Sequence, residues 1–155
     1  MATIYLCAIN EYFVFSSQVF SNRLGSLRIS TIALKSVTNC EIDFFKLSSY
    51  GDEKISSGKV KLLKELNCDV NGRDIIIVED IVDSGLSIKF IEKIFSEHSP
   101  LSMRVVSLLV KPDSLKYDAK IDYIGFKIPS KFVIGYGLDY AQKYRNLRSI
   151  YVLSE

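Results

Sequence analysis

The sequence predicts a single α/β domain over residues 1–155, with a doubly wound, mainly parallel central sheet flanked by helices. Three observations favour this fold class. Apolar runs of strand length recur along the chain, helix-like segments with one apolar face separate several of them, and 155 residues suffice for one core. Ligands of such sheets bind beyond the carboxyl ends of the strands, so the segments that follow strands are the first places to look for a site.

The first half of the chain predicts three strands, one helix and a polar loop. Residues 4–9 are almost continuously apolar, which favours a buried strand. Residues 12–24 carry apolar side chains at helical spacing, which favours an amphipathic helix. Residues 41–47 and 59–66 are expected to be strands. The polar, glycine-containing stretch 48–58 between them is expected to be a mobile surface loop.

The second half carries the clearest strand of the chain. Residues 74–79 (DIIIVE) combine three isoleucines and a valine, which suits a central parallel strand covered on both faces. After a loop over 80–86, residues 87–97 have apolar side chains on one helical face. Residues 103–110 and 121–126 are expected to be further buried strands.

Composition excludes several classes of function. The chain is 48% hydrophobic and 25% charged, with a net charge of +2 that is too small to favour nucleic acid or an anionic membrane as a partner. No apolar run approaches the ~20 residues needed to span a bilayer. The three cysteines lack metal-ligand spacing and His98 is the one histidine, so a zinc site and a Ser-His-Asp triad are poorly supported. We therefore expect a cytoplasmic protein.

The most informative segment is the acidic turn over residues 78–87 (VEDIVDSGLS). The apolar strand ends in Glu79 and Asp80, and Asp83 follows before a Ser-Gly-Leu-Ser stretch that opens a helix. Adjacent carboxylates can accept hydrogen bonds from a ribose diol or help to hold a divalent cation. The turn offers backbone N–H groups, two hydroxyls and a helix N-terminus, which suit a phosphate. The alternative is solvated acids, with Asp83 or Ser84 acting only as a helix cap.

Residues 78–87 resemble the phosphoribosyl-diphosphate signature of the type I phosphoribosyltransferases. The tail narrows the resemblance to the hypoxanthine or hypoxanthine-guanine branch through Lys111-Pro112 and the segments 122–129 (DYIGFKIP), 131–140 (KFVIGYGLDY) and 144–147 (YRNL). The similarity extends over residues 4–155. It implies a purine-salvage enzyme that transfers the 5-phosphoribosyl group from phosphoribosyl diphosphate to hypoxanthine or guanine, giving IMP or GMP and diphosphate, with Mg²⁺.

The resemblance also implies roles in the acidic turn. Glu79 and Asp80 would hold the ribose hydroxyls, in agreement with the diol argument, and both are candidates for metal contacts. Asp83 would face purine N7 and exchange its proton as general base or acid. The 5′-phosphate would be wrapped by five consecutive residues, Asp83, Ser84, Gly85, Leu86 and Ser87.

Further roles follow from the tail. Lys111 would donate to the 6-oxo group of the base, Phe132 would stack on the purine and Val133 would contribute backbone groups to the base edge. Without the resemblance, Lys111 reads as a solvated loop lysine and Phe132 as core. Asp139 would bind Mg²⁺ with the diphosphate, and Arg145 would bind diphosphate oxygens.

Ser49 and Tyr50 match the family's mobile loop, which closes over the active site and excludes water; the alternative is an ordinary flexible hairpin. Tyr140 is expected only to pack. The resemblance further implies a homodimer or homotetramer acting on small-molecule substrates.

Two departures from the family pattern affect the expected activity. Where the family has Leu-Lys-Gly in the loop that receives the diphosphate, this chain has Ile9, Asn10 and Glu11. Asn10 removes a cation and Glu11 adds bulk and negative charge beside an anionic ligand, which predicts weaker binding of phosphoribosyl diphosphate. The chain also starts at the first strand, which predicts a reduced N-terminal hood over the base, whether the chain is naturally short, truncated or read from a late start.

Two other functions stay open on sequence grounds. One is a relative that prefers xanthine, which Lys111 and Phe132 do not exclude. The other is a weakened or inactive homologue that binds nucleotide as a regulator, which the altered residues 9–12 favour and the intact Asp83, Asp139 and Arg145 oppose.

Overall fold

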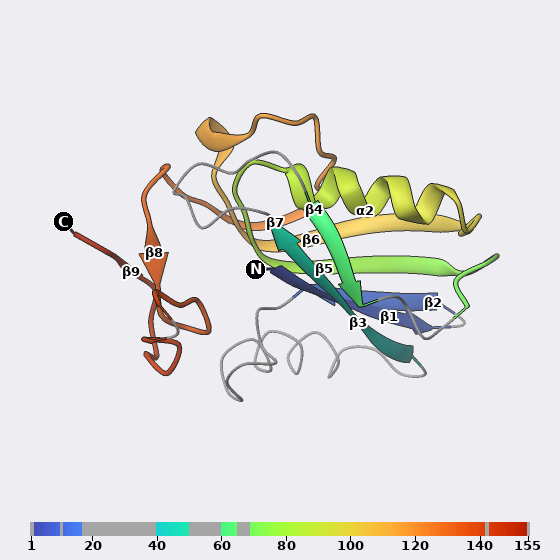
Figure 1. The fold of residues 1–155 in the computed structure, drawn as a ribbon, viewed down its shortest axis with the longest axis horizontal. Coiled ribbons are helices and arrows are strands. Elements are labelled where there is room, and N and C mark those ends of the chain that lie inside the picture. Colours follow the sequence, from blue (N-terminus) through green and yellow to red (C-terminus); the bar gives the residue numbers. More distant parts are fainter. Residues whose placement is uncertain are drawn as a thin grey trace.

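Figure 1 shows the fold of the chain in a computed structural model. The structure describes the backbone of four N-terminal strands and describes side chains as well in the remainder. The four strands are β1 (Ala2–Ile9), β2 (Glu11–Ser16), β3 (Cys40–Ser49) and β4 (Val60–Lys64), and the remainder is residues 69–141 and 143–154.

In the part of the chain that the structure describes, the main sheet contains seven strands in the order β4-β3-β1-β2-β5-β6-β7. Its second half is parallel, as expected: β5 (Asp74–Val82) pairs with β6 (Ser102–Val110), which pairs with β7 (Tyr123–Lys127). In the first half, β1 runs antiparallel to its neighbours β2 and β3. The sheet is therefore mixed at its N-terminal side and parallel where the acidic turn lies.

Helix α2 (Leu86–Ser96) crosses from β5 to β6 and packs on one face of the parallel strands (Figure 1). Its buried face consists of Ile88, Ile91 and Phe95, spaced at about one helical turn. These side chains pack in one cluster with Ile75 and Ile77 of β5. Because full burial of one large apolar side chain contributes roughly 1.5–3 kcal/mol, this cluster fixes the end of β5 relative to the start of α2.

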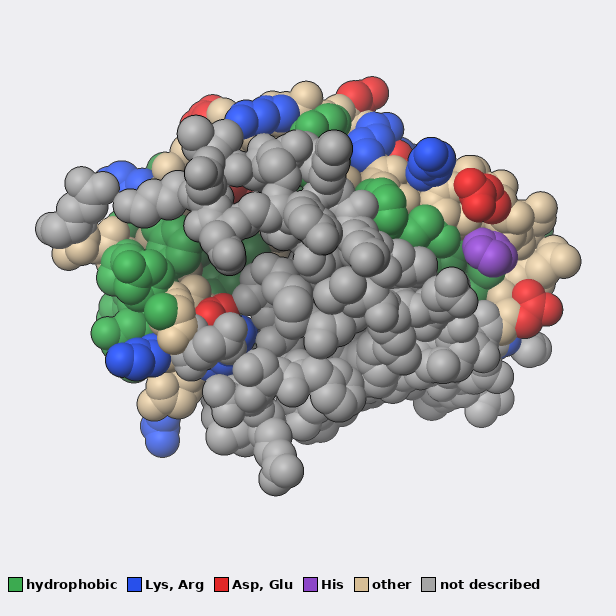
Figure 2. Space-filling model, in the orientation of Figure 1, with side chains coloured by type: hydrophobic (Ala, Val, Ile, Leu, Met, Phe, Trp, Pro, Cys, Tyr) green, Lys and Arg blue, Asp and Glu red, His purple; other side chains and the backbone are tan. Residues whose placement is uncertain are grey.

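The C-terminal part lies outside the main sheet. A 3-10 turn, η2 (Pro112–Ser114), begins the connection from β6 to β7, and β8 (Val133–Ile134) pairs with β9 (Tyr151–Val152) in a separate antiparallel ribbon. Figure 1 shows this ribbon at one end of the molecule, and Figure 2 shows hydrophobic side chains gathered at the same end. The ribbon therefore carries side chains that the main core does not cover.

Every strand expected from the sequence is present, with ends shifted by a few residues. The burial expected for residues 121–126 is wrong, because all five residues of β7, the last strand of the sheet, are exposed. The expected helix over 12–24 is wrong for its first part, because residues 11–16 form β2; the rest of that range lies outside the described residues. Apolar residues in a short run do not distinguish a helix from a strand, and here Phe13 and Phe15 pair with Ile42 and Phe44 of β3.

Two smaller expectations change in the same region. Ile9 ends β1, as the strand expected over 4–9 predicted, but the loop expected after it is wrong at Glu11 and Tyr12, which lie in β2. Ser49 ends β3 and pairs with Val60, so it belongs to a strand. Asn10, Tyr50 and the rest of the expected lid loop lie outside the described residues. Among the helices in the described part, none has the length and apolar character needed to cross a membrane.

Candidate active site

The acidic end of β5 is longer than expected, because the strand continues through Asp80 to Val82. Successive side chains of a strand point to opposite faces of the sheet. Glu79 is accordingly buried at 3% exposure and lines a pocket under the start of α2, whereas Asp80 is half-buried and does not line it. The two adjacent carboxylates therefore serve different parts of the site.

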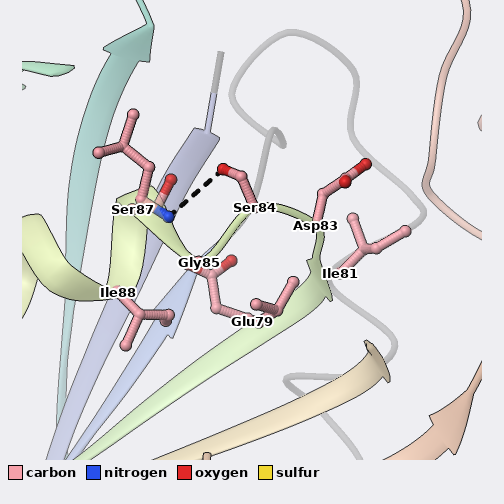
Figure 3. A pocket seen from close by; sticks show the side chains of 9 residues that line it. Glu79, Ile81, Asp83, Ser84, Gly85, Ser87 and Ile88 are labelled. Carbon is pink, nitrogen blue, oxygen red and sulfur yellow. Dashed lines mark hydrogen bonds between the residues drawn. The ribbon is translucent and has the colours of Figure 1, made fainter. Parts of the chain in front are cut away.

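Figure 3 shows the turn that joins β5 to α2. Gly85 is the N-cap residue of α2 with φ of 81°, a left-handed conformation that glycine adopts without strain. The Leu86 N–H donates to Ser84 Oγ at 3.4 Å, but no described side chain caps the helix at Gly85. The N-cap residue is therefore Gly85, and of the two residues expected as alternative caps, Ser84 contacts a helical N–H through its hydroxyl. The first N–H groups of a helix lack intrahelical acceptors, so they suit an anion.

The pocket beside this turn is small. It encloses about 100 Å³, and its lining comes from the end of β5 and the start of α2: Glu79, Ile81, Val82, Asp83, Ser84, Gly85, Leu86, Ser87 and Ile88 (Figure 3). Sites that enclose a drug-sized molecule take about 300–1,000 Å³. The pocket therefore fits one group such as a phosphate and leaves the rest of a nucleotide outside it. All five residues expected to wrap the phosphate line this pocket.

Asp83 and Lys111 meet at the carboxyl ends of the parallel strands β5 and β6. Lys111 Nζ donates to Asp83 Oδ2 at 2.5 Å, and the Lys111 backbone N–H donates to Val82 O at 3.0 Å. Lys111 is buried at 7% exposure, while the side chain of Asp83 is 55% exposed. The site thus presents a buried cation and a solvent-facing carboxylate in contact. The alternative of a solvated loop lysine is therefore wrong.

A second ion pair lies in the segment after β8. Arg145 Nη2 contacts Asp139 Oδ1 at 2.8 Å, and Arg145 Nη1 donates to Gly137 O at 3.0 Å. Arg145 is buried, and Asp139 is partly buried. The sequence places these residues six positions apart, and the antiparallel bridge between Tyr140 and Lys143 folds the chain back between them.

Asp80 links this ion pair to β5. Burial is the largest effect on the Asp80 carboxyl and raises its pKa to about 6. The hydrogen bond from the Ile81 N–H and the positive charge of Arg145 lower this pKa, whereas the negative charge of Asp139 raises it. These electrostatic effects show that Asp80, Asp139 and Arg145 share one region. The structure therefore brings Asp80, which the resemblance placed at the ribose, into range of Asp139 and Arg145, which it placed at the diphosphate.

Phe132 and Val133 lie at the start of the C-terminal ribbon. Phe132 is 52% exposed and meets Tyr140 edge to face, with 5.8 Å between ring centroids and an interplanar angle of 81°. Val133 begins β8. Sequence reasoning treated Tyr140 as a packing residue and missed its contact with Phe132. The aromatic character of both positions was the available signal.

Sequence reasoning also missed the support of the acidic turn. Ser84 O accepts hydrogen bonds from the N–H groups of Lys116 and Tyr117, at 3.0 and 3.2 Å. Residues 112–119 lack periodic apolar spacing, and backbone hydrogen bonds leave no residue-type signature, so no sequence signal marks this contact.

Comparisons with known proteins agree with this arrangement. A family model described as "Phosphoribosyl transferase domain" matches residues 20–141. The hypoxanthine-guanine phosphoribosyltransferase of Bacillus subtilis (strain 168) is 47% identical over 130 residues, which cover 83% of this chain and 72% of that protein. The chain belongs to the hypoxanthine-guanine phosphoribosyltransferases. Its fold is therefore the type I phosphoribosyltransferase fold, as the resemblance implied.

Solved structures of the family support the assignment. A hypoxanthine-guanine phosphoribosyltransferase from Bacillus anthracis, with a HEPES molecule in its active site, is 39% identical with a TM-score of 0.74, over 85% of this chain and 78% of that one. The hypoxanthine phosphoribosyltransferase of Trypanosoma cruzi, in complex with the product IMP, is 40% identical with a TM-score of 0.63, over 71% and 58% of the two chains. The chain therefore spans less than two thirds of the length of that relative.

The carboxylates of the site suit a divalent cation such as Mg²⁺ that takes its remaining ligands from water and substrate. Among the residues described with side chains, no group of three His, Cys, Asp or Glu side chains is arranged to hold a metal by itself. Mg²⁺ is usually bound through one or two carboxylates together with waters and substrate phosphates. Asp80 and Asp139, whose charges affect each other, are two carboxylates of the type that such sites use.

Proposed function

We propose that this chain transfers the 5-phosphoribosyl group of phosphoribosyl diphosphate to hypoxanthine or guanine, giving IMP or GMP and diphosphate in purine salvage. The observation that carries the proposal is the contact of Lys111 with Asp83 directly beside the phosphate-sized pocket. A base-recognising pair and an anion-binding turn then lie side by side at the carboxyl ends of β5 and β6, where ligands of such sheets bind.

The phosphate end rests on backbone groups. The 5′-phosphate would accept hydrogen bonds from the N–H groups at the start of α2 and from the hydroxyls of Ser84 and Ser87. The helix dipole and the absence of acidic residues from the first turn of α2 support an anion there. Glu79, which lines the same pocket, would face the ribose side of the ligand.

The base end matches the chemistry of a 6-oxopurine. O6 and N7 lie next to each other on one edge of such a base, as they do in guanine. Lys111 would donate to O6 while the neighbouring Asp83 carboxylate takes the proton of N7. A 6-amino purine presents a donor where Lys111 also donates, so adenine would be disfavoured. Phe132, half exposed in the structure, would stack on the purine, and Val133 would offer backbone groups to the base edge.

The reaction needs no covalent nucleophile on the protein. The bond from the anomeric carbon to diphosphate breaks with its electron pair leaving on diphosphate, while the bond to the purine nitrogen forms and the N7 proton passes to Asp83. Positive charge develops on the ribose in the transition state, and the carboxylates of Glu79 and Asp80 would stabilise it. Arg145, held by Asp139, would bind the diphosphate oxygens.

Asp139 and Asp80 would hold Mg²⁺ together with the diphosphate, with Glu79 as a further candidate. The bound ion would supply neutralisation of the charge that develops on the leaving group. Tyr50, next to Ser49 at the end of β3, stays a candidate for a lid, and Asn10 and Glu11 stay candidates for weakened diphosphate binding. A cytoplasmic location and a homodimer or homotetramer stay predictions from the resemblance.

The proposal is tested by incubating the protein with Mg²⁺, phosphoribosyl diphosphate and one purine at a time, and by separating the nucleotides formed by chromatography. Hypoxanthine and guanine should give IMP and GMP, adenine should give no AMP, and xanthine reports on the remaining specificity. Faster formation of the xanthine nucleotide than of IMP would replace the proposal with the xanthine-preferring alternative. Nucleotide binding without any nucleotide formation would favour the regulator.

A further inference from the structure

The segment that connects β6 to β7 is attached to the phosphate turn. We call residues 111–119 the brace. At its start, Lys111 bonds to Val82 through its backbone and to Asp83 through its side chain. Further along, Ser84 O accepts both the Lys116 and the Tyr117 N–H. Figure 1 shows this connection passing near the junction of β5 and α2.

The same segment packs against Gly85 on the side where any other residue would carry its Cβ atom. A Cβ atom built on Gly85 would lie 3.1 Å from Ala119 Cβ, 3.2 Å from Tyr117 O and 3.4 Å from Leu115 Cδ2. Tyr117 O also accepts the Ala119 N–H at 2.8 Å, which holds Ala119 in place against the turn. The N-cap position of α2 therefore rests on a small residue that lies 34 positions later in the chain.

We infer that Ala119 is a positioning residue for the phosphate: its methyl group sets how far the 83–85 turn can move away from the pocket, and thereby where the N–H groups of α2 point. This inference rests on the proposed function, because it concerns the 5′-phosphate of the same site. A longer side chain at 119 would clash with the backbone at Gly85, displace the turn and misalign these donors. Hydrogen bonds weaken steeply once their angle is distorted.

The inference predicts an effect on the phosphate that a general loss of packing would not produce. Ala119 is partly buried and also packs on the core beneath α2, as does Ile121 two residues later. Ile121 is not among the nearest neighbours of Gly85. Ile121→Phe therefore adds bulk to the same core at a matched position without touching the turn.

The test compares the dissociation constants of IMP and inosine for four proteins: wild type, Ala119→Leu, Ala119→Ser and Ile121→Phe. Calorimetry measures both ligands, and where inosine binds weakly its dissociation constant is obtained by competition with IMP. Overpacking of a closed contact should weaken IMP binding to Ala119→Leu at least about 10-fold. Inosine has no phosphate, so its dissociation constant for this variant should stay within about 2-fold of the value for wild type, which is much less than the tenfold change that 1.4 kcal/mol produces.

Two variants serve as controls. Ala119→Ser, of nearly the same size, and Ile121→Phe should keep the affinity of wild type for IMP. Thermal unfolding of all four proteins separates affinity from stability, and Ala119→Val replaces Ala119→Leu if that variant does not fold.

Equal IMP affinity of Ala119→Leu and wild type would overturn the inference, and so would an equal loss in Ile121→Phe or an equal loss for inosine. If wild type binds no IMP, the proposed function falls together with the inference. If wild type binds IMP but makes no nucleotide, while Ala119→Leu loses the phosphate-dependent affinity, only the proposed reaction falls.

Discussion

The acidic turn and the C-terminal ribbon contribute to one site in opposite ways. The turn over residues 83–85 joins β5 to α2, whose side chains form the buried core. It also accepts backbone hydrogen bonds from Lys116 and Tyr117. The ribbon of β8 and β9 holds Phe132 with half of its surface exposed, in contact with Tyr140, which is also half exposed. One end of the site is thus fixed by backbone and core, the other by exposed side chains.

The difference follows from the ligand groups that each end would bind. A phosphate is recognised by several N–H groups whose directions depend on the backbone, so the backbone must be rigid. A flat base is recognised largely by the face of one ring, and small displacements of an aromatic side chain cost little. Substitutions at the turn should therefore affect catalysis and stability, whereas substitutions at the ribbon should affect base binding alone.

The largest effect is expected for Asp83→Asn. Asparagine keeps an oxygen that can accept from Lys111 Nζ but cannot take a proton from N7, so kcat should fall by about 100-fold or more, as for the loss of a general base. Steady-state rates of IMP formation measure this, and thermal unfolding checks that the fold persists. A kcat within a few-fold of wild type would remove Asp83 from the proton transfer.

The next largest effect concerns stability at Gly85. Both Gly72 and Gly85 have positive φ, at 66° and 81°, but a Cβ on Gly72 meets no atom of the described residues within 4 Å. Gly72→Ala should therefore cost about 1 kcal/mol from conformation alone. Gly85→Ala adds the close contacts with Ala119 and Tyr117, so its cost should be about 2–4 kcal/mol. Urea unfolding of the two variants measures the difference; equal costs would show that the brace yields to a methyl group.

A smaller, pH-dependent effect is expected for Asp80→Asn in the ligand-free protein. Burial raises the pKa of Asp80 from 3.8 to about 6. The unfolded chain releases this proton at lower pH than the folded one, so the contribution of Asp80 to stability falls as pH rises from about 4 to 6. Asparagine carries no charge, so Asp80→Asn avoids the cost of burying an ionised carboxylate. A pKa shift of one unit corresponds to about 1.4 kcal/mol, so the variant should be more stable than wild type by up to about 3 kcal/mol at pH 7.

Urea unfolding in the presence of EDTA at several pH values between 4 and 7 tests this expectation. The advantage of Asp80→Asn should shrink toward pH 4, whereas Asp118→Asn, at an exposed position, serves as the matched control. An advantage that stays constant with pH would show that ionisation of Asp80 is not its cause.

The smallest effect is expected at the ribbon. Phe132→Ala removes the proposed stacking surface and should raise the KM for hypoxanthine by roughly 10-fold, at the lower end of the range for stacking of a base on an aromatic ring. Thermal stability should change little because Phe132 is half exposed. Phe132→Tyr, which keeps the ring, serves as the control and should behave as wild type. A fall in stability comparable to that of Gly85→Ala would contradict the contrast between the two regions.

Much of this architecture could be predicted from the sequence, for physical reasons that differ between elements. The DIIIVE run predicts a buried strand because its β-branched side chains suit a sheet covered on both faces, and the apolar face of residues 87–97 predicts α2. The run after residue 11 was misread as helix, because a few adjacent apolar residues have no clear period.

By itself the sequence determined which residue types stand at the strand ends, and hence the acidic turn, the family and the substrates to test. Only the tertiary structure decided that Lys111 is buried against Asp83, that Asp139 and Arg145 share a region with Asp80, and that Ala119 supports Gly85. These contacts join residues far apart in the chain. Their geometry depends on strand register and on backbone hydrogen bonds, which every residue type except proline can make, so no local pattern encodes them.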